Sequence, residues 1–376
     1  MNAKLKVFST CLPQPLALCA ANLGDKVLRL QDEPAAILKG LHRCGTVVLS
    51  TGNAVAAATQ SAQFSNLCVG SGGHGYLSQS GSLLTLQLRE WRTVFAVVAP
   101  LGHIPARSFL FFDRGGHLIQ RVTVTGAGFA FEDLVCAMLH HEQHSLPLPD
   151  WSASAFSKDS QESAIEGNIK IDVDVNALEQ DWANACDDDC FDRMLVKHGI
   201  NRLNAMRHVR DSYALAVQPD SVLSLLGMAA EQGVPVSYSV PNSGSLQTLI
   251  GTANALHYQR GGVLINVADS ALSLKPSAIA SAWRVRRRSE RGIDTAIELY
   301  DCGGNQVLQI KDGCVKSGAS LHSRKASSVK GYTSTANAAS VSDRWAKLIG
   351  DGLIPRRRSQ HGAALSVPLL GVTRLH

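Results

Sequence analysis

Two stretches of this chain, about 190 residues apart, are alike, and this internal repeat constrains the fold more than any other feature. The first stretch contains Trp91 and residues 111–116, and the second contains Trp283 and residues 299–304. In each stretch a strand-like run follows the Trp, and a second run ends in Asp before a Gly-Gly turn. The offset is 192 at the Trp and 188 at the Asp and the glycines. Such a period is far too long for a solenoid, so the repeat indicates a duplicated domain.

Other pairs follow the same offset. Asn53 and Asn242 each lie in an alternating apolar segment at an offset of 189, and residues 84–86 correspond to residues 272–274 at 188. The strand candidates are joined by short turns, which predict antiparallel hairpins. The helices are grouped at the start of each half. We therefore predict the α+β class, as a tandem duplication in which each half is a large antiparallel sheet with helices packed on it.

The composition pattern gives the domain boundaries. Residues 145–172 are rich in Ser, Pro, Asp and Glu without periodicity, which is typical of a linker. The second repeat opens with a single expected helix from Asn176 to about His198. The predicted parts are a first repeat at 1–144, the linker at 145–172, a second repeat at 173–353 with a flexible insertion at 316–342, and a basic tail at 354–376.

Composition narrows the class of protein. The 376 residues are 45% apolar and 18% charged, as in soluble globular proteins, and no run of 18 apolar residues predicts a membrane span. The nine cysteines include no Cys-x-x-Cys, which favours reduced thiols and a cytoplasmic location. His140 and His144 are four apart but lack the glutamate of a zinc-protease motif. We assign no metal ligand.

Several charged segments are candidate binding groups. Arg202, Arg207 and Arg210 lie within one short segment and could pair bidentately with the carboxylates of an acidic small molecule. The alternative, held equal, is ion pairing with the nearby aspartates 187–189 and Asp192. Cys186 and Cys190 flank three of these aspartates, and we interpret this segment as a solvated acidic face in mid-helix.

Two further segments have both a functional and a structural interpretation. His74 lies in the glycine-rich segment 70–75, which we interpret as a flexible loop from which the imidazole could reach a ligand. The basic segments 284–291 and 356–358 are interpreted as solvated; the alternative is a nucleic-acid surface, which we do not expect.

The order of these residues resembles the cytoplasmic hemin-transport and hemin-degrading factors of Gram-negative bacteria (HemS/ChuS type). The matching positions of the second half are Trp182 and residues 191–205, 234–247, 251, 264–267, 279–283 and 298–301. The first half matches more weakly, through Gly45, Asn53, Trp91, Phe95 and residues 111–116. The resemblance covers roughly residues 15–310, and that family is itself an internal duplication.

The resemblance implies that heme lies between the second repeat's sheet and its opening helices. The family's axial histidine corresponds to Asp189 in this chain, and its propionate-binding arginine is kept as Arg202. His198 or His74 could replace the missing imidazole. Arg286 and Arg288 are weaker candidates for binding a heme propionate. The family's arginine before Trp91 is replaced by Gln87 or Thr85, and its aromatic–Gly–Arg segment by residues 311–314.

The resemblance also gives a function. We predict a cytoplasmic heme-handling protein of bacterial heme-iron utilisation, acting in hemin transport and trafficking, with heme degradation made doubtful by Asp189. The alternative is a degenerate, non-catalytic paralogue that acts as a protein-interaction module. The candidate partners are heme or a related tetrapyrrole, a heme oxygenase or reductase, and a second copy of the chain; a membrane and nucleic acid are not expected.

Overall fold

The computed structural model describes residues 15–79, 81–126, 128–144, 173–289, 292–314 and 335–356. The expected linker at 145–172 lies outside these residues, as does most of the expected insertion at 316–342 and of the expected tail at 354–376. Helix α10 (Thr335–Gly352) contains the part of the insertion that is described and extends past Trp345.

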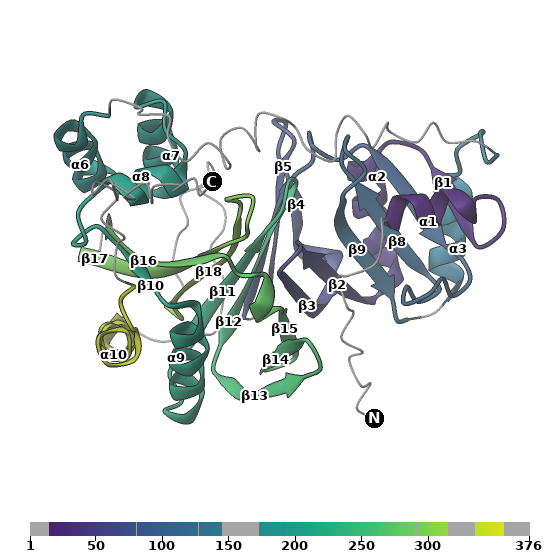
Figure 1. The fold of residues 1–376 in the computed structure, drawn as a ribbon. Helices are drawn as coiled ribbons and strands as arrows, with labels where there is room; N and C mark the ends of the chain where they lie inside the picture. Colours follow the sequence, from purple (N-terminus) through teal and green to yellow (C-terminus); the bar gives the residue numbers. More distant parts are fainter. Residues whose placement is uncertain are drawn as a thin grey trace, which may run out of the picture.

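The described chain forms two antiparallel nine-stranded sheets (Figure 1). In spatial order, the first sheet is β1 (Val27–Leu30), β7 (Thr93–Val97), β8 (Ser108–Phe112), β9 (Leu118–Val124), β2 (Thr46–Gly52), β3 (Ala56–Gln63), β15 (Ser270–Leu274), β14 (Gly262–Val267) and β13 (Ala253–Gln259). The second is β10 (Ala214–Val217), β16 (Ser281–Ser289), β17 (Gly292–Tyr300), β18 (Gln306–Asp312), β11 (Val236–Pro241), β12 (Ser245–Gly251), β6 (Ser82–Gln87), β5 (His74–Gln79) and β4 (Leu67–Val69).

Each sheet takes three strands from the other repeat. Strands β4 to β6 of the first repeat complete the second sheet, where β6 pairs with β12. Strands β13 to β15 of the second repeat complete the first sheet, where β15 pairs with β3. The predicted α+β class, the antiparallel sheets and the duplication are confirmed, but each sheet draws on both repeats rather than on one.

The strand registers define the repeat more sharply than the sequence does. Phe95 pairs with Leu110 in the first sheet, and Trp283 pairs with Glu298 in the second, so equivalent positions of these strands are 188 residues apart. Trp283 is therefore equivalent to Phe95. The matching of Trp91 with Trp283 at an offset of 192 is wrong by four residues, because both aromatic side chains happen to lie close to the start of equivalent strands.

Helices cover both sheets. The first repeat contributes α1 (Pro15–Ala21), α2 (Pro34–Gly40) and α3 (Gly128–Ala137), together with the 3-10 turns Leu41–Cys44 and Phe64–Asn66. The second repeat contributes α6 (Val175–Asn184), α7 (Asp188–Lys197), α8 (Arg202–His208), α9 (Pro219–Glu231), α10 and the 3-10 turn Pro276–Ala278. Helices α6 to α8 lie on one side of the second sheet, and α9 and α10 on the other (Figure 1). None of the described helices is long and apolar enough to cross a membrane.

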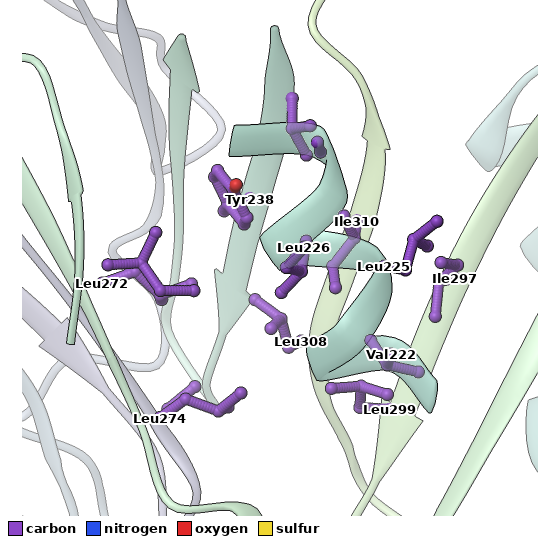
Figure 2. Close-up of a cluster of buried hydrophobic side chains, with 14 of the residues drawn as sticks. Val222, Leu225, Leu226, Tyr238, Leu272, Leu274, Ile297, Leu299, Leu308 and Ile310 are labelled. Carbon is purple, nitrogen blue, oxygen red and sulfur yellow. The ribbon is translucent and has the colours of Figure 1, made fainter. Parts of the chain in front are cut away.

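The largest apolar core lies between α9 and the strands around it (Figure 2). One face of α9 points toward strands of the second sheet and toward β15 of the first. The buried side chains there include Val222, Leu225, Leu226, Tyr238, Leu272, Leu274, Ile297, Leu299, Leu308 and Ile310. Burial of this apolar surface holds the two sheets to one another, so the exchanged strands share one core.

The single helix expected from Asn176 to His198 is wrong, because the structure has two helices separated by residues 185–187. Asp174 caps α6, and its side chain accepts hydrogen bonds from two backbone N–H groups of the first turn. The carboxylate of Asp187 caps α7 by accepting from the N–H of Cys190. An aspartate in extended conformation favours such a cap over helix continuation. Cys186 and Cys190 therefore lie at a helix start and not in mid-helix.

Asn53 and Asn242 link the two repeats reciprocally. The Nδ2 of Asn53 donates to the carbonyl oxygens of Pro241 (2.9 Å) and Val307 (2.8 Å) in the second repeat. The Nδ2 of Asn242 donates to those of Gly52 (3.2 Å) and Ile119 (2.7 Å) in the first. Each asparagine also accepts two backbone hydrogen bonds in its own turn. The repeated asparagines are thus a structural joint.

Candidate functional site

Helices α6 to α8 cover only one end of their face of the second sheet. Trp182 and Phe191 of the helices pack there against Trp283 and Val285 of β16, and the indole N–H of Trp182 donates to the carbonyl of Arg286 (2.9 Å). Side chains alternate along a strand, so the register identifies the residues of the same face on the neighbouring strands.

The rest of this face, which we call the platform, is half-buried or exposed and carries mostly polar side chains. Following the register outward from β18, its polar residues include Gln309, Lys311, Ser237, Ser239, Thr248, Thr85, Tyr76 and His74, and its apolar residues include Leu83, Leu246 and Ile250. The hydroxyl groups of Ser239 and Thr248 are 2.8 Å apart in its centre. The platform therefore offers hydrogen-bonding groups together with a few apolar side chains, unlike the wholly apolar face of a buried sheet.

A buried ion pair lies where the helices meet the platform. Nε and one terminal nitrogen of Arg202 donate to the two oxygens of Glu298 at 2.9 and 2.6 Å. The hydroxyl of Tyr300 (2.7 Å) and the amide of Gln309 (3.2 Å) also donate to this fully buried carboxylate. Burial acts to raise the pKa of Glu298, but the charge and hydrogen bonds of Arg202 outweigh it and hold the pKa below its usual value.

This pairing bears on the two interpretations of the arginine segment. Arg202 pairs with Glu298 and lies 3.8 Å from Asp192, and Arg210 pairs with Glu179. Ion pairing is therefore found, mostly with glutamates that the sequence did not indicate. The role of Arg202 toward a propionate stays a prediction, now for a guanidinium that a buried carboxylate already holds in place.

Two more cations surround this pair. Arg287 donates to Asp188 of α7 at 2.6 Å, and its guanidinium lies over the ring of Phe191 at 4.8 Å, as does that of Arg202. Burial lowers the pKa of the Lys311 ammonium, and Asp188 opposes this. No salt bridge among the described residues includes Lys311. Arg202, Arg287 and Lys311 form what we call the cation cluster.

A small cavity lies beside the cation cluster. Its volume of about 20 Å³ is enough for about one water molecule. Its lining includes Cys186, Asp187, Asp188, Arg287 and Lys311. This cavity is too small for a large planar ligand, whereas the platform next to the cation cluster is partly open.

The other candidate residues are placed as follows. Asp189 is exposed in the first turn of α7, next to Asp188. His198 is the C-cap of α7, and its Nε2 lies 2.7 Å from a carboxylate oxygen of Asp181 on α6. His74 is exposed on the platform at β5, four strands from Lys311 on β18.

Arg286 and Arg288 are exposed and alternate with Arg287 along β16, so their side chains leave the sheet on the face opposite the helices. Arg288 also borders the small cavity. The structure thus brings Arg202 together with Arg287 and Lys311, which the sequence interpretation had not selected. The sequence did contain a signal for Arg287. It lies four residues after Trp283 on one strand, and residues an even number apart share a strand face.

Comparisons with known proteins support one family. The profile described as "Haemin-degrading HemS.ChuX domain" matches residues 14–130 and 199–312, one stretch in each repeat. The hemin transport protein HmuS of Yersinia pestis is 25% identical over 297 residues, which cover 78% of this chain and 82% of that protein. The hemin transport protein HemS of Yersinia enterocolitica is 24% identical over 295 residues, with 78% and 82% covered.

Two solved structures have a similar fold. The holo form of PhuS, a heme-binding protein from Pseudomonas aeruginosa, matches with a TM-score of 0.68 and 27% identity, covering 79% of this chain and 84% of that one. The heme degrading enzyme ChuS of Escherichia coli O157:H7 matches with a TM-score of 0.72 and 23% identity, covering 91% of both chains. The second likeness is one of fold alone.

Proposed function

This chain belongs to the haemin-degrading HemS/ChuX domain family, and we propose from this premise that it handles heme in bacterial heme-iron utilisation. The ligand, heme or a related anionic tetrapyrrole, lies on the platform with its carboxylates toward the cation cluster. Transport or delivery of heme is the form of the function that the residues of this chain support best.

The observation that carries the proposal is the cation cluster at the edge of the platform. Lys311 is half-buried, and a ligand carboxylate would offset the desolvation of its ammonium. Arg287 adds a planar guanidinium, which suits a carboxylate partner. Because both cations border a partly open sheet face with mostly polar side chains, they fit the propionates of heme rather than an uncharged ligand.

The residues present do not fit the iron in the same way. The family's ligand position is Asp189, whose carboxylate is a poor substitute for imidazole. The ring of His198 is engaged with Asp181, and His74 stands at the far side of the platform. The chain therefore holds the carboxylates of the ligand and supplies no histidine from α7 to its metal. These residues favour delivery of heme over its degradation.

Delivery requires a recipient, and a heme oxygenase is the recipient that fits this role. A reductase partner, a homodimer and the cytoplasmic location stay predictions from the sequence.

Hemin titration of the purified full-length chain tests the proposal. We expect the Soret band to shift and saturate near one equivalent. Substitution Lys311→Met should weaken binding about tenfold or more, because a hydrogen bond to a charged group contributes about 1.5–3 kcal/mol. The matched control is Lys39→Met on α2, an exposed lysine of the first repeat that should leave the titration unchanged.

A Soret band that neither shifts nor saturates would sink the heme proposal and favour the interaction-module alternative. Saturable binding that Lys311→Met leaves unchanged would keep heme binding but remove the cation cluster as its anchor.

A further inference from the structure

Two thiols and a carboxylate converge at the junction of α6 and α7. Cys186 lies between the helices and Cys190 in the first turn of α7, and their sulfur atoms are 3.9 Å apart. The Oδ2 of Asp187 lies 3.9 Å from the sulfur of Cys186. One ligand atom from each of the three residues lies within 4.8 Å of the others. Cys186 and Asp187 are exposed, so ions in solution can reach the group.

We propose that Cys186, Asp187 and Cys190 form a binding site for a thiophilic divalent cation of the Zn²⁺ type. In a tetrahedral zinc site with zinc–sulfur bonds of about 2.3 Å, two thiolate sulfurs are separated by about 3.8 Å. The observed separation of 3.9 Å is almost this edge length. Small side-chain rotations therefore suffice to bring both sulfurs and one carboxylate oxygen onto a shared ion.

The helix cap arranges these ligands. The Oδ1 of Asp187 accepts the N–H of Cys190 at 2.6 Å, so this oxygen caps α7 and the other is left beside the thiols. The guanidinium of Arg193 lies 3.0 Å from the sulfur of Cys190. A hydrogen bond with Asp187 nevertheless raises the pKa of the Cys190 thiol, so an incoming cation has to displace its proton. The cap thus holds the carboxylate in position beside the two sulfur atoms.

A fourth ligand and a balance of charge are both available at this site. The water-sized cavity is lined by Cys186 and Asp187, and a water in it could supply a fourth ligand. On binding, each thiol releases one proton to solvent, and the divalent cation takes the place of both protons. No oxidant or further reactant is required.

A second cluster, His140, His141 and Glu142, is a weaker candidate. The Nδ1 of His140 already accepts the backbone N–H of Glu142 at 3.0 Å. The rings of His140 and His141 stack at 4.3 Å. The group also contains no sulfur, so it lacks the ligand type that selects a thiophilic ion.

Cobalt provides the test, because Co²⁺ bound by thiolates absorbs strongly and Zn²⁺ is silent. The reduced full-length protein is titrated with Co²⁺ in the absence of oxygen and of competing thiols. We expect a thiolate-to-cobalt band that saturates at one equivalent and disappears when Zn²⁺ is added. The double variant Cys186→Ser with Cys190→Ser should lose this band. The control Cys302→Ser removes another exposed cysteine and should keep it.

The carboxylate is tested separately with Asp187→Asn, because asparagine caps a helix as well as aspartate does. Its affinity for Co²⁺ should fall at least about tenfold, given that even outer-shell substitutions cost 10- to 100-fold. The inference is overturned if no band forms, or if the double variant, shown to be folded by circular dichroism, keeps it. Hemin titration of the same variants is a separate readout, so failure of the heme proposal leaves this result interpretable.

Discussion

Substitution of Arg202 by methionine should destabilise the protein strongly and in a pH-dependent way. Glu298 is fully buried, and Arg202 supplies two of its four hydrogen bonds and the only cation that it contacts directly among the described residues. In Arg202→Met the carboxylate keeps Tyr300 and Gln309 but loses its counter-charge. Removing one partner of a buried ion pair costs about 3–5 kcal/mol. We expect a loss of that size in the free energy of unfolding at pH 7.

The partner substitution should cost less. Arg202 keeps 18% of its side chain exposed, whereas Glu298 has none, so water can solvate the arginine that remains in Glu298→Gln. The double variant Arg202→Met with Glu298→Gln removes both charges of the pair and should recover part of the loss. Urea unfolding of the four proteins, followed by circular dichroism, gives this double-mutant cycle.

The sign of the pH dependence follows from the pKa of Glu298. In the wild type this pKa is lowered, so the pair stabilises the fold above the unfolded pKa of about 4.3 and stops doing so as pH falls through the folded pKa. In Arg202→Met the largest interaction that opposes burial is lost, so burial raises the pKa of Glu298 relative to the wild type. The deficit of the variant should therefore shrink as pH falls from 7 toward 5. A cost below about 1 kcal/mol at pH 7, or a deficit that does not change with pH, would refute this reasoning.

Two further predictions concern the repeats and the heme site. Asn53→Ala and Asn242→Ala should each lower the free energy of unfolding by about 2–4 kcal/mol, because each removes two inter-repeat hydrogen bonds and a turn cap. The measurement is unfolding in urea. Wild-type stability in either variant would contradict the role of these asparagines in joining the repeats. Asp189→His should strengthen hemin binding at least about tenfold and give the Soret spectrum of a histidine complex, since it restores imidazole at the ligand position. Its control, Asp133→His on α3, should bind hemin as the wild type does, and equal spectra for both variants would show that Asp189 does not face the ligand.

Part of the candidate site could be predicted from the sequence, and part could not. Arg202 and the ligand position Asp189 were found through a family pattern, which fixes positions along a chain but not the directions of side chains. Glu298 and Lys311 were missed because their importance depends on which strand face the helices cover. Cys186 and Cys190 were assigned to one helix, because four-residue spacing suits a helix, whereas the Asp187 cap begins a new one.

The sequence by itself determined the duplication, the strand and turn pattern, and the α+β class. These follow from local physics: alternating burial along strands, and Gly-Gly turns after Asp113 and Asp301 in which one glycine adopts positive φ. Only the tertiary structure decided which strands pair. The exchanged strands are β4 to β6 and β13 to β15. Backbone hydrogen bonds form equally well with a strand of either repeat, so they do not specify the partner. The apolar core shared between the sheets favours the exchanged arrangement. That exchange also places His74 of the first repeat on the platform of the second, a neighbourhood that no local pattern contains.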